Sequence, residues 1–108
     1  MELKEKSLAI INHYDVLPQL KYFQSEVYEL TEAIIMYEDA KYNSYEKYSS
    51  DEIDGLKNHI AEEIADVQLM LNQFKGYYGI SDYQIKKIMS FKADRQLDRI
   101  KNENFKEC

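Results

Sequence analysis

Glycine, proline and cysteine are all scarce in this chain of 108 residues. The sequence holds three glycines and one proline. Because a small β domain needs many tight turns, this scarcity argues against a many-stranded fold and favours a few long helices. The single cysteine, Cys108, has no intrachain partner. We therefore expect no disulfide framework, and a reducing, cytoplasmic compartment.

Clustered positive charge and long apolar runs are lacking too. The net charge is −6 at pH 7, whereas nucleic-acid backbones attract clusters of Lys and Arg. No segment approaches the roughly 20 apolar residues that span a bilayer, and residues 1–6, MELKEK, lack the apolar stretch of a signal peptide. The sequence predicts one domain over residues 1–108, with no membrane or nucleic-acid partner, that binds anions only through a metal ion.

Apolar residues recur at helical spacing in four segments. They predict helices over about residues 3–13, 17–40, 51–78 and 82–102. Pro18 suits the first turn of the second helix, Gly79 the end of the third, and Ser81 with Gln84 a capping box for the fourth. Residues 41–50 form a long polar loop whose tyrosines could stack on a nucleobase. Helices of this length must bury their apolar sides against one another, so we predict an all-α, antiparallel four-helix bundle.

The second and third helices repeat one pattern of apolar and acidic residues. Their apolar stripes comprise Leu20, Phe23, Val27, Leu30, Ile34 and Tyr37, and Leu56, Ile60, Ile64, Val67, Leu71 and Phe74. Aligning the two stripes places Glu26 on Glu63, inside the apolar arc of each helix. The same alignment places Glu29 on Asp66, at the border with the polar side.

These four carboxylates predict a metal site. Buried carboxylates are costly to ionise and repel one another, so acids on facing sides of two packed helices call for a cation. An all-oxygen ligand set suits Mg²⁺, with Mn²⁺ as a substitute. A single such pair is more often a solvated surface, but two pairs in matched phase favour the metal. A di-iron site is disfavoured because the chain has no Glu-x-x-His segment.

The segments 26–29 (EVYE) and 63–66 (EIAD) resemble the paired ExxE and ExxD motifs of the MazG-like and dimeric-dUTPase-like all-α NTP pyrophosphatases. Residues 59–71 are similar to the third helix of small MazG-like proteins, and residues 91–100 to their C-terminal helix. The resemblance covers about residues 8–101. The chain departs from the family in a longer loop between the motifs and in Ser25, where many relatives carry an acid.

The resemblance implies a Mg²⁺-dependent nucleoside triphosphate pyrophosphohydrolase that releases pyrophosphate and a monophosphate from NTPs or dNTPs. Its metal ligands would be Glu26, Glu29, Glu63 and Asp66. The bound metal would lower the pKa of a water nucleophile. Glu62 is the second choice as ligand or base, with a surface acid as its alternative interpretation. The resemblance also implies a homodimer or homotetramer.

Four more polar residues are candidates for the site. Lys92 occupies a position where the apolar period of the fourth helix calls for a hydrophobe, and Arg95 flanks it. We predict that both bind substrate phosphates, with an interhelical ion pair as the alternative. His59, one turn before Glu63, and Gln73 are candidates for contact with the base or with the ligands; a surface histidine is the alternative for His59.

A second class of function stays open. The chain could be a non-catalytic helical-bundle interaction or regulatory protein of phage or bacterial origin. A metal-binding enzyme should be stabilised against heat by divalent cations, and an interaction protein should not.

Overall fold

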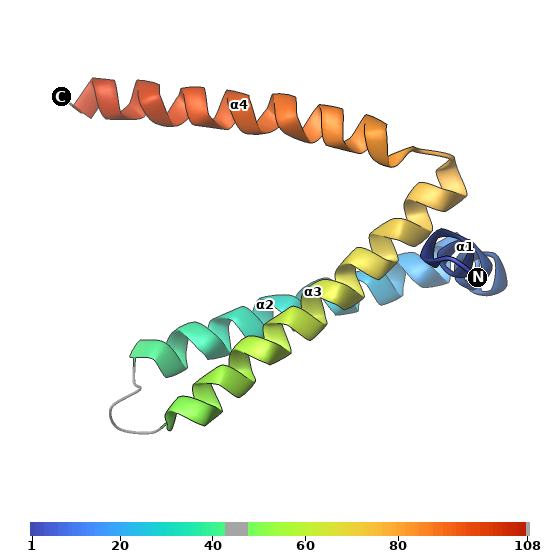
Figure 1. Ribbon diagram of the computed structural model, residues 1–108, viewed down its shortest axis with the longest axis horizontal. Coiled ribbons are helices and arrows are strands. Elements are labelled where there is room, and N and C mark those ends of the chain that lie inside the picture. Colours follow the sequence, from blue (N-terminus) through green and yellow to red (C-terminus); the bar gives the residue numbers. More distant parts are fainter. Residues whose placement is uncertain (43–47, 108) are drawn as a thin grey trace. The chain divides into compact units, whose positions relative to one another are not determined.

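A computed structural model describes residues 1–42 and 48–107, with the side chains of residues 1–42 and 48–103. It contains α1 (Leu3–Tyr14), α2 (Val16–Tyr42), α3 (Ser50–Tyr78) and α4 (Asp82–Glu107), and no strand within these residues (Figure 1). The all-α prediction is confirmed. The chain forms two compact units, Met1–Tyr77 and Tyr78–Cys108, and each is described by itself. Of the predicted loop 41–50, residues 43–47, which include Tyr45, lie outside the described residues, while Lys41 and Tyr42 belong to α2 and Ser50 begins α3.

A residue with positive φ lies between α1 and α2, and another follows the end of α3. Asp15, at φ 71° and ψ 160°, donates its N–H to the Ile11 carbonyl at 2.8 Å and accepts from the Gln19 N–H at 3.2 Å. One residue therefore closes α1 and opens α2, whose first turn contains Pro18 as predicted. Gly79 ends α3 at φ 67°, also as predicted, because a left-handed residue suits glycine best.

Hydrogen bonds cap the two C-terminal helices. The Gln84 N–H donates to the Ser81 Oγ at 3.1 Å, as predicted for the start of α4. A second capping box begins α3: the Glu52 N–H donates to the Ser49 Oγ at 3.2 Å, and the Ser49 N–H donates to the Glu52 carboxylate at 3.4 Å. The S-x-x-E spacing could have revealed it. The fourth helix was predicted too short: it continues beyond residue 102 because its end contains no glycine or proline.

The first unit is built on an antiparallel pair formed by α2 and α3. The rings of Phe23 and Phe74 meet edge to face, with centroids 5.6 Å apart. The Gln19 amide donates to the Gln73 carbonyl oxygen at 2.7 Å. Because the early residues of α2 meet the late residues of α3, the helices run in opposite directions, as predicted.

Helix α1 packs beside this pair. The Leu8 side chain of α1 lies against Gly76 of α3. A Cβ atom added to Gly76 would be 3.7 Å from Leu8 Cδ1. Ile11 is fully buried, and Ser7 is buried with its hydroxyl donating to the Leu3 carbonyl at 2.8 Å. The polar Ser7 is therefore satisfied inside its own helix.

Buried positions along α2, and along α3 as far as Val67, recur at spacings of three and four residues, typical of a coiled-coil seam. Near its end α3 is also buried or half-buried at Leu69, Asn72, Gln73, Lys75 and Gly76. The buried or half-buried seam residues are Val16, Gln19, Phe23, Glu26, Leu30, Ala33, Tyr37 and Ala40 of α2, and Ile53, Leu56, Ile60, Glu63, Val67, Met70 and Phe74 of α3. The seam corrects the predicted stripes, because five of their members lie beside it. Polar residues hold seam positions that a purely apolar pattern leaves out.

Candidate functional site

The residues that flank the seam fall on two opposite sides of the α2–α3 pair. An antiparallel pair has a local two-fold axis, so residues that follow equivalent seam positions on both helices lie on the same side. On one side, the apolar residues that directly follow a seam residue in the sequence form what we call the apolar edge: Leu20, Val27, Ile34, Ile64 and Leu71. On the other side, the polar residues that directly precede a seam residue in the sequence form what we call the polar face: Tyr22, Glu29, His59, Asp66 and Gln73. The acidic residues predicted as ligands are confined to the seam and the polar face.

Three carboxylates converge beside the seam. One oxygen from each of Glu26, Glu29 and Glu63 lies within 4.8 Å of the other two; we call these residues the acidic cluster. Glu26 and Glu63 are only 5% and 7% exposed. The Oε2 atoms of both are buried and accept no hydrogen bond from the described residues. Buried carboxylate oxygens without partners are costly, and a cation would satisfy them.

The pKa of Glu63 reflects its burial and the acids around it. Burial raises the pKa of Glu63 above its ordinary value, and the charges of Glu29, Asp66 and Glu26 raise it further, while His59 acts in the opposite sense. Such a carboxyl gains a proton readily unless a cation compensates its charge. The cluster therefore brings together carboxylate oxygens that can ligate a cation and negative charges that a cation would compensate.

Tyr22 belongs to the site although the sequence did not single it out. Its hydroxyl donates a hydrogen bond to Glu26, and this bond, together with the charge of Glu26, raises the pKa of Tyr22. Asp66 and Glu29 raise it further. The four-residue spacing from Tyr22 to Glu26 places both on one side of a helix and could have revealed the contact.

Asp66 differs from the other three predicted ligands. It is exposed and lies outside the group of three converging carboxylates. It is nevertheless close enough that its charge raises the pKa of Glu63, and it lines a pocket together with Glu26. Asp66 thus lies at the border of the acidic cluster and adds a further carboxylate there.

His59 connects the buried acid to an exposed one. Its Nε2 lies 3.8 Å from Glu63 Oε1, and its Nδ1 lies 3.8 Å from Glu62 Oε2. The side chain of Glu62 is 75% exposed, so Glu62 cannot share the enclosed position of the cluster. His59 therefore lies between Glu63 and Glu62, and its predicted contact with the base or with the ligands stays a prediction.

A pocket of about 510 Å³ adjoins the cluster within the first unit. Its lining residues come from α1, α2 and α3: Ile10, Tyr14, Pro18, Gln19, Tyr22, Glu26, Asp66, Leu69, Met70 and Gln73. Gln73, a predicted candidate, lies in it with Gln19, which sequence reasoning missed. The signal was available, because Gln19 precedes Glu26 by seven residues and so holds the equivalent seam position one heptad earlier.

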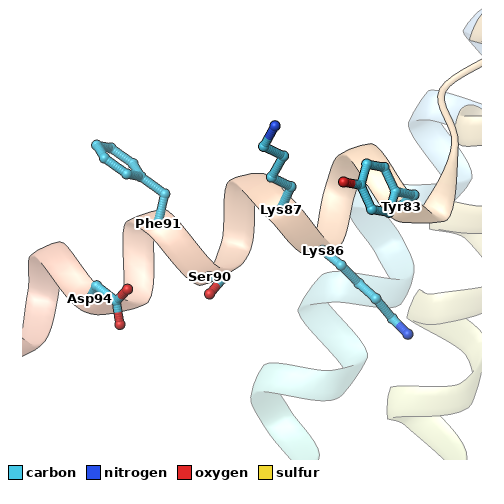
Figure 2. Close-up of a pocket in the computed structure, with 6 residues that line it drawn as sticks. All are labelled: Tyr83, Lys86, Lys87, Ser90, Phe91 and Asp94. Carbon is cyan, nitrogen blue, oxygen red and sulfur yellow. The ribbon is translucent and has the colours of Figure 1, made fainter.

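The predicted phosphate-binding residues lie on α4, in the second unit. Lys92 and Arg95 are both exposed, and the Arg95 guanidinium carbon is 5.9 Å from the centroid of the Phe91 ring. Figure 2 shows the neighbouring part of this helix, where Lys86 and Lys87 point to opposite sides. Side chains that spread around one helix form an open surface rather than an enclosed site. The phosphate role of Lys92 and Arg95 stays a prediction.

Within the described part of the chain, no helix is both long and apolar enough to cross a membrane. Comparison with protein-family models, with curated proteins and with solved structures finds no match for this sequence. The functional argument therefore rests on the acidic cluster, its neighbours Tyr22 and His59, and the pocket beside them.

Proposed function

We propose that this protein is a Mg²⁺-dependent nucleoside triphosphate pyrophosphohydrolase, which converts an NTP or dNTP into pyrophosphate and the monophosphate. The observation that carries the proposal is the pair of buried Oε2 atoms of Glu26 and Glu63, which have no hydrogen-bond partner among the described residues. Mutually repelling buried acids are difficult to explain as structural elements, because apolar residues would pack the seam at lower cost. A cation-binding role accounts for them.

The residues present fit a hard divalent cation. Glu26, Glu29 and Glu63 would hold it through carboxylate oxygens, with Asp66 at the rim for a second ion or a bound water. When bound, such a cation would supply Lewis-acid activation of a water molecule and positive charge for the phosphates. Mn²⁺ shares the preference for oxygen ligands and should substitute.

The chain's own residues orient the cluster and handle protons. The hydrogen bond from Tyr22 fixes the Glu26 carboxylate, and His59 favours the ionised form of Glu63. In the proposed reaction, water attacks the α-phosphorus, the bond from that phosphorus to the bridging oxygen breaks, and pyrophosphate leaves. The proton of the attacking water goes to a nearby carboxylate; Glu63 is the first candidate and Glu62, through His59, the second.

The proposal also assigns roles to two cationic residues of α4 and to the apolar edge. The role we propose for Lys92 and Arg95 of α4 is to bind phosphate groups of the substrate. The apolar edge, whose members are 39–44% exposed, supports a homodimer or homotetramer, because a contiguous apolar row favours association. A nucleotide-pool enzyme of this kind would work in the cytoplasm.

The same apolar edge favours the second candidate, a helical interaction protein that has no catalytic activity. Its regular seven-residue spacing on α2, at Leu20, Val27 and Ile34, suits the docking of another helix. The two candidates differ in what they require of the acidic cluster, which only the enzyme needs for cation binding.

The deciding experiment is incubation of the purified protein with Mg²⁺ and each NTP and dNTP, followed by product analysis. Pyrophosphate with a nucleoside monophosphate is the expected outcome, and orthophosphate with a diphosphate would contradict the assignment. Thermal unfolding with and without Mg²⁺ or Mn²⁺ provides a readout independent of turnover. Absence of both turnover and cation stabilisation would favour the interaction protein.

A further inference from the structure

The pocket beside the acidic cluster contains a pair of amides that the cation chemistry does not use. Gln73 is 2% exposed and Gln19 is 8% exposed. Both stand where the packing of α1, α2 and α3 would accommodate apolar side chains. Buried amides are unfavourable unless their hydrogen-bonding groups are satisfied, so this pair calls for an explanation.

The hydrogen bonds within the pair satisfy only part of its capacity. The Gln19 Nε2 donates to the Gln73 Oε1 at 2.7 Å, and the Gln73 Nε2 donates to the Met70 Sδ at 3.6 Å. A thioether is a weak acceptor, and each amide has two N–H donors and a carbonyl with two lone pairs. A ligand with a stronger acceptor beside a donor would therefore bind the pair better than Met70 does.

The rest of the pocket suits a flat heterocycle. Tyr14 and Tyr22 contribute aromatic rings that are 56% and 55% exposed, and Leu69 and Pro18 contribute apolar surface. A volume of about 510 Å³ lies in the range of pockets that hold small molecules. Aromatic rings stack on nucleobases, and glutamine amides recognise base edges by pairs of hydrogen bonds.

The pocket also lies next to carboxylates of the proposed cation site. Glu26 and Asp66 line it and belong to, or border, the acidic cluster. A ligand that fills the pocket and extends towards these carboxylates would have its charged end at the proposed cation site. A nucleotide has this arrangement, with a flat base at one end and phosphates at the other.

We infer that the Gln19–Gln73 pair reads the hydrogen-bonding edge of the substrate's base, so that the enzyme discriminates among bases. This inference rests on the proposed function for the position of the phosphates, and it adds the base-binding subsite and the residues that set specificity. Each amide can present an adjacent donor and acceptor, which is the pattern that distinguishes one base edge from another.

The test replaces both amides together, because removing one would leave the other buried without a partner. The double variant Gln19→Leu with Gln73→Leu keeps the side-chain size similar. The matched control is Gln24→Leu with Gln68→Leu, which changes two exposed glutamines on the same helices. Unfolding midpoints of all three proteins establish that they fold.

The first measurement is binding of the common ribo- and deoxyribonucleosides, which carry no phosphate, in the presence of a chelator. The wild type and the control should prefer one base, by about 10- to 100-fold over the poorest, as expected for a two-hydrogen-bond contact. The double variant should lose this preference. This readout needs neither the cation nor turnover, so it remains valid if the proposed hydrolase activity fails.

The second measurement is hydrolysis of the corresponding triphosphates with Mg²⁺. In the double variant the ratio of kcat/KM between the best and the poorest base should fall by a similar factor, while stabilisation by Mg²⁺ is unchanged. The inference is overturned if the wild type binds all nucleosides equally or none, or if the double variant keeps the full preference. Base-selective binding without hydrolysis would support the pocket and reject the hydrolase.

Discussion

The two sides of the α2–α3 pair have opposite chemistry although one repeating pattern generates both. The polar face carries Glu29, Asp66 and His59 beside the buried acids, whereas the apolar edge carries aliphatic side chains at the equivalent distance from the seam. Around Glu26 and Glu63 the seam therefore has polar residues on one side and apolar residues on the other. The proposed cation site and the proposed association surface thus lie on different sides of the same helix pair.

The comparison also explains why acids are found in the seam itself. Glu26 and Glu63 occupy positions that are usually apolar in a helix pair. From there they face the polar side, where Tyr22 donates to Glu26 and His59 approaches Glu63. The apolar edge gains nothing from these acids, so their position is explained by the polar face alone.

The largest effect should come from neutralising the buried acid. Glu63→Gln is nearly isosteric and relieves repulsion, so the metal-free protein should be at least as stable as the wild type, while turnover falls by more than about 100-fold. Stabilisation by Mg²⁺ should be lost as well. Glu38→Gln, an exposed carboxyl of α2 outside the acidic cluster, is the control and should keep the activity. A Glu63→Gln protein that unfolds without metal would mean that this carboxylate is a structural ion-pair partner.

The next largest effect tests whether the two sides are independent. Val27→Lys with Leu71→Lys places charges on the apolar edge, and should raise the dissociation constant of the oligomer by about 100-fold or more, since each apolar side chain contributes about 1.5–3 kcal/mol when buried. Sedimentation over a range of concentrations measures this. The control, Asn58→Lys with Ala65→Lys, adds the same charge on the outer side of α3, away from the edge. A wild type that is monomeric throughout would refute the association surface, and loss of Mg²⁺ stabilisation in the edge variant would show that the sides are coupled.

A smaller effect is expected from the residue that orients an acid. Tyr22→Phe removes the hydroxyl that donates to Glu26, and should weaken cation affinity by about 10-fold, as is typical when a partner of a ligand is lost. Tyr28→Phe is the matched control, because the Tyr28 hydroxyl donates to the exposed Glu32. Titrating Mn²⁺ or Mg²⁺ against the unfolding temperature measures the affinity. Equal behaviour of the two variants would remove Tyr22 from the site.

The smallest effect concerns pH and metal-free protein. The pKa of Glu63 is raised above 4.5 in the folded state, so in the window above that value the folded protein binds more protons than the unfolded chain. The contribution of Glu63 to stability must then fall as pH rises through this window. With a chelator present, Glu63→Gln should therefore gain stability relative to the wild type between about pH 4 and pH 7. A difference in unfolding free energy that does not change with pH would contradict the raised pKa.

Local signals predicted the helices well. Periodicity, Pro18, Gly79 and the Ser81 capping box act over a few residues, so they placed the starts and ends of the helices with small errors. The capping box at Ser49 was overlooked although its spacing was visible. The end of α4 was predicted too early because polarity was taken to end the helix, while the residues there have adequate helix propensity.

The candidate site was predictable in its residue types and phases, but not in its contacts. Matching the stripes placed Glu26 and Glu63 on the inner sides of their helices, and the burial of both agrees with this. The same matching treated Glu29 and Asp66 as equivalent, whereas only Glu29 joins the converging carboxylates. Phase is a property of each helix alone, and it does not include the stagger between them.

By itself, the sequence determined that long helices would form and that acids would lie at the inner edge of two of them, because both follow from residue spacing along one chain segment. Only the tertiary structure decided the stagger that joins Glu29 to the buried acids, the pairing of Gln19 with Gln73, and which apolar residues stay at the edge. The physical reason is that these contacts depend on how side chains from distant segments fit together. A shift of one helical turn, about 5.4 Å, would keep every periodic pattern and separate the acids.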